Sequence, residues 1–211
     1  VAELEQLMSD LALATPPPAA QPFVPKPGQL VRAQYTVGDE WHRARIQSVS
    51  AARDSCEVAY VDFGNTERLP VSRIQPLAEP LARAAPFAQP ARLAFLRLPS
   101  DPLEGNAFAA DYCAEALECV RRLVEGRELV ANVEARVAGV MYVTLYDPLL
   151  GRPIFDKSIN AEIARAGFAV PEHDDAAKCN PKALADIRDI VNTARTEHRG
   201  MWEYGDVTAE D

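Results

Sequence analysis

The stretch from residue 29 to residue 76 constrains the fold of this chain most, because strand-like segments and turn signals alternate there at short intervals. The segments are rich in β-branched and aromatic residues, and the turns between them contain Gly38-Asp39, Asp54 and Gly64-Asn65. Strands this short leave exposed edges unless they close on themselves, so we expect a small antiparallel barrel. The four candidate strands are residues 30–37, 41–49, 56–63 and 66–70.

Beyond residue 90 the sequence mixes strand and helix patterns. Apolar residues at helical spacing predict one helix over residues 106–124 and another that Asn180-Pro181 opens, while Ser158 caps a shorter helix. This order predicts an α+β chain, mostly β, in which the small barrel is followed by an oligonucleotide-binding-type barrel with helices. The strands predicted in this part are residues 91–98, 128–135 and 140–146.

Both long helices of the second part carry an apolar face. Tyr112, Leu117 and Val120 share one face of the first helix, so we expect them to contact the core. A charged residue at Leu117 should then unfold this lobe. The corresponding residues of the last helix are Ile187, Ile190 and Val191.

The first 27 residues combine a short helix with a spacer. Leu4, Leu7, Met8 and Leu11 recur at helical spacing, and the pattern stops before a run of prolines. The segment that follows is rich in Pro and Ala and is expected to be extended. The apolar stripe of this helix needs a partner surface. The expected organisation is a helix over residues 1–14, a spacer over 15–27, the first barrel over 28–78, the second lobe over 79–204 and a tail over 205–211.

Composition and charge argue against several classes of protein. The chain has 211 residues, 48% of them hydrophobic, which is enough for one large or two small cores. No stretch approaches about eighteen consecutive apolar residues, and the N-terminal stretch is acidic, so we expect neither a membrane span nor secretion. The net charge is −9 without a basic block, which disfavours binding to nucleic acid through phosphate neutralisation.

The cysteines and histidines show no metal-binding pattern. No CxxC pair and no HExxH or similar cluster occurs. We therefore expect reduced structural thiols, no metal and no other cofactor. The residues concerned are Cys56, Cys113, Cys119, Cys179, His42, His173 and His198.

Aromatic residues gather at one end of the predicted strands of the first barrel. Tyr35 ends the first strand, His42 opens the second, and Tyr60 lies late in the third, followed by Phe63 and Asn65 in a turn. A cup of such rings binds a desolvated organic cation, and an amide can orient the ligand through a hydrogen bond. The alternative interpretation is that these are ordinary barrel residues, since aromatics favour strands whatever the function.

Two sets of motifs, in this order, resemble a known family. Residues 40–45 (EWHRAR) and 60–67 (YVDFGNTE) are similar to the core signature of an extended Tudor domain. Residues 160–170 and 200–206 resemble the staphylococcal-nuclease-like fold. Nearly the whole chain is therefore similar to the C-terminal part of the Tudor staphylococcal nuclease family. The resemblance implies a linker helix over residues 4–11 that packs on the nuclease-like lobe and joins it to the Tudor barrel.

The resemblance also implies a cage for methylated arginine. Tyr35, Tyr60 and Phe63 match cage aromatics, with the acidic Asp62 in a supporting position, and Asn65 matches the amide that contacts the guanidinium. The implied ligand is symmetrically dimethylated arginine in Arg/Gly-rich protein tails. The implied role is that of a scaffold in an RNA-regulatory protein of the cytoplasm and nucleus.

His42 is the departure from the family pattern, which has a tyrosine after the tryptophan. An imidazole has a smaller and less electron-rich face than a phenol, and its unperturbed pKa is near 6.5. A protonated His42 would repel a cationic ligand, so affinity should fall as the pH drops through this range.

Two further functions are alternatives to peptide binding. An active nuclease of this fold has an essential arginine before the strand at residues 141–146, but Gly139-Val140 stands there, so we expect no catalysis by this chain. The alternative function is an RNA-binding or nuclease-supporting module with a weakened cage. Five arginines could make weak RNA contacts, although acidic residues interleave with them: Arg43, Arg45, Arg53, Arg68 and Arg73.

Overall fold

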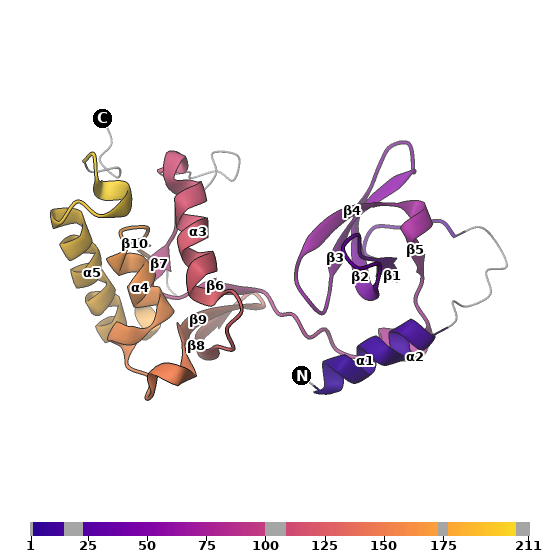
Figure 1. Ribbon diagram of the computed structural model, residues 1–211, viewed down its shortest axis with the longest axis horizontal. Helices are drawn as coiled ribbons and strands as arrows, with labels where there is room; N and C mark the ends of the chain where they lie inside the picture. The colour runs from indigo at the N-terminus through magenta and orange to yellow at the C-terminus, as the bar shows by residue number, and fades with distance from the viewer. Residues whose placement is uncertain (1, 15–22, 100–108, 173–176, 206–211) are drawn as a thin grey trace. The chain divides into compact units, whose positions relative to one another are not determined.

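The computed structural model describes residues 2–14, 23–99, 109–172 and 177–205. Its contacts divide the chain into two compact units, unit 1 (Val1–Gln89) and unit 2 (Pro90–Asp211), and each is described on its own (Figure 1). Unit 1 is built on a five-stranded antiparallel sheet, and unit 2 combines small sheets with helices. The predicted α+β fold class is confirmed. Within the described ranges, no helix is long and apolar enough to cross a membrane.

The sheet of unit 1 has the strand order β4-β3-β2-β1-β5. Alternate residues of β3 point into its core, where Cys56, Val58 and Tyr60 are buried. Two strands, β2 and β4, have the predicted bounds, whereas β1 and β3 end earlier than predicted because tight turns follow them. The strands are β1 (Leu30–Gln34), β2 (Trp41–Val49), β3 (Ser55–Tyr60), β4 (Thr66–Pro70) and β5 (Ile74–Pro76), with a 3-10 turn at Val71–Arg73.

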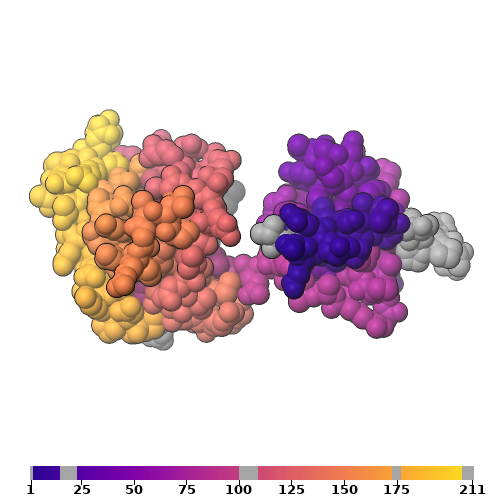
Figure 2. Space-filling view, turned by 60° about the horizontal axis from the view of Figure 1, so that its bottom comes forward, coloured from indigo at the N-terminus to yellow at the C-terminus, as the bar shows by residue number. Residues whose placement is uncertain are grey.

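Helix α1 (Ala2–Leu13) packs against β2 of unit 1, and Figure 2 shows it in indigo across one face of this unit. Leu7 and Leu11 are its buried residues. Arg32 of β1 donates from Nη1 to the carbonyl oxygen of Ala14 at 2.6 Å, which satisfies a carbonyl that the end of a helix leaves open. The apolar stripe of α1 therefore meets the barrel, while its packing on the second lobe stays a prediction.

The segment after β5 belongs with unit 1, although the second lobe was expected to begin at residue 79. It contains the short helix α2 (Glu79–Ala82). The buried guanidinium of Arg43 donates to the carbonyl oxygens of Leu81, Ala84 and Ala85 at 2.7–3.0 Å. These bonds attach the segment to the barrel, and sequence patterns do not reveal them.

Unit 2 contains a three-stranded sheet in the order β6-β9-β8 and a separate pair, β10-β7. Strand β6 runs parallel to β9, and β8 runs antiparallel to it. Helices α4 and α5 contact each other and share one core with α3 (Figure 1). The elements are β6 (Ala91–Leu93), β7 (Leu96–Arg97), α3 (Cys113–Val124), β8 (Val130–Val137), β9 (Val140–Tyr146), α4 (Ile159–Arg165), β10 (Val170–Pro171) and α5 (Pro181–Thr196), with 3-10 turns at Ala110–Tyr112, Pro148–Leu150, Phe155–Lys157, Ala177–Cys179 and Gly200–Trp202.

The helix caps of unit 2 match the prediction, whereas two of its strands differ from it. Ser158 accepts a hydrogen bond from the Ala161 amide at 3.1 Å, and Asn180 accepts one from the Ala183 amide at 3.2 Å. Strand β8 lies at Val130–Val137 instead of the predicted residues 128–135. The strand predicted over residues 91–98 is split into β6 and β7, because Phe95 between them has a φ of 68°. Residues 106–108 of the predicted helix lie outside the described residues, and α3 begins at Cys113.

Leu117 was predicted to face the core of unit 2, and this is wrong. Its side chain is 55% exposed, whereas Ala116 and Cys119 are the buried residues of α3. The small side chains on the buried face allow α3 to pack closely on α4, with which it is in contact. On α5, by contrast, Ile187 and Val191 are buried as predicted, and the partly buried Ile190 packs against the same core.

Leu117→Asp is therefore expected to change the free energy of unfolding by about 1 kcal/mol or less, because an exposed helix position pays only a propensity cost. Ile187→Ala, which empties a fully buried site, should cost about 2–5 kcal/mol. Thermal denaturation of the two variants checks this contrast. If Leu117→Asp lowers the unfolding temperature as much as Ile187→Ala does, Leu117 is part of the core after all.

Candidate functional site

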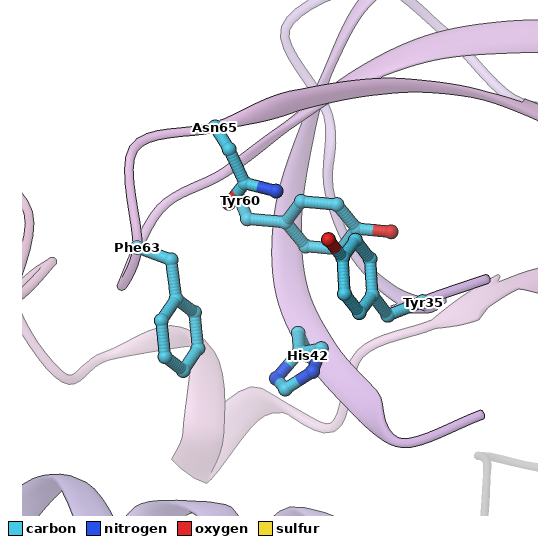
Figure 3. Close-up of a pocket in the computed structure, with 5 residues that line it drawn as sticks. All are labelled: Tyr35, His42, Tyr60, Phe63 and Asn65. Carbon is cyan, nitrogen blue, oxygen red and sulfur yellow. The ribbon is translucent and has the colours of Figure 1, made fainter. Parts of the chain in front are cut away.

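Five side chains of unit 1 line one cavity of about 420 Å³: Tyr35, His42, Tyr60, Phe63 and Asn65 (Figure 3). Tyr35 follows β1, His42 is the second residue of β2, and Tyr60 ends β3. Phe63 and Asn65 lie in the turn between β3 and β4. All five residues predicted for the cage thus lie together. Their role in ligand binding stays a prediction.

The rings of the cavity meet edge to face. The His42 ring lies 4.9 Å from Phe63, 5.7 Å from Tyr60 and 5.9 Å from Tyr35, measured between centroids. Tyr35 and Tyr60 are 5.5 Å apart, with an interplanar angle of 85°. Edge-to-face contacts are a preferred geometry of aromatic pairs. The rings therefore hold one another in place around the cavity that they line.

The turn between β3 and β4 carries two of the cavity residues. The Tyr60 amide donates to the Asn65 carbonyl at 2.9 Å, and the Gly64 amide donates to the Tyr60 carbonyl at 2.7 Å. Gly64 has a φ of 88°, a conformation that glycine adopts without a steric cost. This turn brings Phe63 and Asn65 back beside Tyr60.

Tyr60 is both a core residue and a wall of the cavity. Only 1% of it is exposed, and its hydroxyl donates to Glu67 Oε2 at 2.7 Å. Burial, reinforced by the Glu67 carboxylate, raises the pKa of Tyr60 well above its ordinary value. The ring is therefore a neutral phenol, fixed in place by its hydroxyl. No local pattern in the sequence indicates this role of Glu67.

Tyr35 is held through its backbone. Arg73 donates to the carbonyl oxygens of Gln34 and Tyr35 at 3.1 and 3.0 Å, and it also pairs with Asp39. These bonds fix the end of β1, and with it the Tyr35 ring. Arg73, which the RNA hypothesis placed on a basic surface, thus has a structural role.

Asp62 was predicted to support the cage, and it lies beside the cavity without lining it. Its carboxylate accepts two hydrogen bonds from Arg43, at 2.9 and 2.6 Å, and one from the Phe87 amide at 3.3 Å. Both charged groups are buried. The pair therefore anchors the turn that carries Phe63, and the role of Asp62 toward a ligand stays a prediction.

The His42 ring also contacts α1. Its Nδ1 lies 3.4 Å from the sulfur of Met8. Burial lowers the pKa of His42 below its ordinary value, and the nearby Glu40 and Asp62 oppose this shift. The ring is therefore mainly neutral near neutrality. Met8 was predicted only as part of an amphipathic stripe, because nothing in the local sequence pairs it with a residue so far along the chain.

The chemistry of this cavity suits an organic cation. Ring faces attract a positive charge through their quadrupoles, and the Asn65 amide can accept from an N–H of the ligand. Over the described part of the chain, no group of three or more His, Cys, Asp or Glu residues is arranged to hold a metal ion.

Comparison with known proteins places both units in one architecture. The Tudor domain family matches residues 1–94, and the staphylococcal nuclease homologue family matches residues 91–204, more than half of the chain. The chain therefore belongs to the staphylococcal nuclease homologue family, with a Tudor domain in its N-terminal part.

Together the two units form an extended Tudor domain, as in Drosophila Tudor-SN. The extended Tudor domain of Drosophila melanogaster Tudor-SN (p100) is similar over 95% of this chain and 87% of that chain, with 29% identity and a TM-score of 0.78. Staphylococcal nuclease domain-containing protein 1 of Drosophila melanogaster is 33% identical over 99% of this chain, which spans only 21% of that relative.

A second solved structure has a ligand. The human TDRD1 extended Tudor domain, in complex with a symmetrically dimethylated peptide, is 25% identical, with a TM-score of 0.65 and coverage of 81% of this chain and 79% of that chain.

Proposed function

We propose that this chain is a non-enzymatic binding module that reads symmetrically dimethylated arginine in Arg/Gly-rich protein tails. The observation that carries the proposal is the cavity lined by three aromatic rings, an imidazole and an amide. Methylation leaves the charge of a guanidinium in place and makes it easier to desolvate against ring faces. The dimethylated peptide bound to the human TDRD1 relative supports this choice of ligand. In a longer RNA-regulatory protein, such a module recruits methylated partners.

Calorimetric titration tests the proposal. Arg/Gly-rich peptides, identical except for symmetric dimethylation of one arginine, are compared on the same protein. We expect the methylated peptide to bind about tenfold more tightly, a difference of about 1.4 kcal/mol. Equal affinity for the two peptides would contradict the proposal.

Binding should also weaken in acid. The ligand is a permanent cation, so it binds best to neutral His42, and its affinity should fall as the pH drops below about 6.5. Because burial lowers the pKa of His42 in the free protein, the loss should begin below that ordinary value. His42→Tyr should remove the dependence and strengthen binding by about 0.5–1 kcal/mol. Titrations at about pH 7.5 and about pH 5 measure both effects, and an unchanged affinity would place His42 outside the binding site.

The second candidate function is RNA contact in support of a nuclease, and the match of unit 2 to staphylococcal nuclease homologues favours it. The predicted basic surface of unit 1 is incomplete, because Arg43 is fully buried. Salt dependence separates the two functions. RNA affinity should fall steeply with salt: the logarithm of the binding constant should decrease with the logarithm of the salt concentration by about 0.7 for each phosphate neutralised on a single strand. The affinity of the cage for a methylated peptide should change much less.

A further inference from the structure

We infer that Met8 of α1 is a positioning residue of the cavity: its sulfur accepts a hydrogen bond from Nδ1–H of His42, fixing the ring as the Nδ1–H tautomer and leaving Nε2 as an acceptor for the ligand. The role of Nε2 toward a ligand rests on the proposed function. The tautomer itself does not.

A hydrogen bond between Met8 and His42 can have only one direction, from the imidazole to the sulfur. The two atoms, Sδ of Met8 and Nδ1 of His42, lie 3.4 Å apart. A thioether has no proton to donate and is a weak acceptor, so this contact is a hydrogen bond only when Nδ1 carries the proton. A neutral imidazole has a single N–H, and Nε2 is then unprotonated.

The helix, and not the flexible methionine side chain alone, determines where this sulfur lies. Leu7 and Leu11, which precede and follow Met8, are buried, and Arg32 holds the Ala14 carbonyl at the end of α1. Arg32 in turn stacks on Trp41, the residue before His42, at 4.6 Å from the ring centroid. Helix α1 is thus held on the barrel by its two buried leucines and, at its C-terminal end, by the bond from Arg32 of β1.

Burial has a larger effect on the pKa of His42 than the charged groups around the ring. Glu40 and Asp62 are the charged groups that act on it, and both favour the cation, yet burial outweighs them and lowers the pKa. Tyr35, Tyr60 and Phe63 meet the ring edge to face. In Figure 3 His42 lies between Phe63 and Tyr35, at the boundary of the cavity.

A free Nε2 lone pair has a consequence for the ligand. Symmetric dimethylation leaves one N–H on each terminal nitrogen of the guanidinium, whereas asymmetric dimethylation leaves one terminal nitrogen with none. Asn65 and His42 together offer two acceptors, which suit the symmetric isomer. A tyrosine at position 42 could donate or accept and would impose less of this selectivity.

Nuclear magnetic resonance of the 15N-labelled chain tests the tautomer without any ligand. Long-range correlations in mildly alkaline solution report which ring nitrogen carries the proton, and His42→Phe identifies the His42 signals. We expect Nδ1–H in the wild type and in the matched control Met141→Leu, and a shift toward Nε2–H in Met8→Leu. A wild-type ring protonated at Nε2, or a Met8→Leu variant with an unchanged tautomer, would overturn the inference.

A double-mutant cycle with the symmetrically dimethylated peptide tests the role in binding. Met8→Leu should weaken binding about threefold when His42 is present and leave the affinity of the His42→Phe variant unchanged. An equal loss in both backgrounds, or no loss in either, would overturn the positioning role. If the wild type binds no methylated peptide, the proposed function fails together with the ligand step, and the spectra still decide the tautomer.

Discussion

Replacing Asp62 with alanine is expected to lower the free energy of unfolding of unit 1 by about 3–5 kcal/mol. The carboxylate and its partner Arg43 have side-chain exposures of 1% and 0%, and two hydrogen bonds join them. Removing the carboxylate leaves the guanidinium buried without a counter-charge, and the loss of its solvation then goes uncompensated. The same change removes the acceptor of the Phe87 amide.

Urea denaturation of the full chain measures this loss, and Asp54→Ala is the matched control. Asp54 lies exposed in a turn of the same unit, where its partners are the hydroxyls of Ser50 and Ser55. We expect the control to lose about 1 kcal/mol or less. If the two variants unfold at the same urea concentration, the buried pair does not hold the segment after β5 on the barrel.

Local signals of the sequence predicted the parts of the fold that local physics decides. Strands β2 and β4 begin and end as predicted because turn residues flank them, and the capping side chains of Ser158 and Asn180 start α4 and α5. Helical periodicity identified an apolar face on α3 but could not distinguish the centre of that face from its edge, where Leu117 lies. Phe95 lies between β6 and β7 with a φ of 68°, and a phenylalanine gives no sign in the sequence that the backbone turns there.

The candidate site divides in the same way. The rings could be predicted because the motif at residues 60–67 supplies Tyr60 and Phe63, and the strand pattern places Tyr35 and His42 at adjacent strand ends. Contacts between distant parts of the chain could not be predicted, such as that of Met8 with His42 or those of Arg43 with three backbone carbonyls. These contacts depend on how α1 and the segment after β5 pack on the sheet, which no local pattern encodes.

Phe63→Ala is expected to weaken binding of the symmetrically dimethylated peptide by about 1–2 kcal/mol, roughly tenfold, without destabilising unit 1. The side chain is 50% exposed on a turn, so its removal leaves the barrel core intact while one wall of the cavity is lost. Tyr60→Ala, in contrast, would empty a position that is only 1% exposed and would cost about 3–5 kcal/mol of stability, comparable to truncating a buried phenylalanine. Loss of binding by that variant would therefore not separate recognition from folding.

Phe87→Ala is the matched control for Phe63→Ala, because Phe87 is 41% exposed in the same unit and does not line the cavity. Calorimetry should show wild-type affinity for Phe87→Ala and a roughly tenfold loss for Phe63→Ala, with thermal unfolding unchanged in both. If the two variants bind with equal affinity, Phe63 is not part of the binding site. Since His42 makes its shortest ring contact with Phe63, at 4.9 Å, the pH dependence of binding should also change in Phe63→Ala and persist in Phe87→Ala.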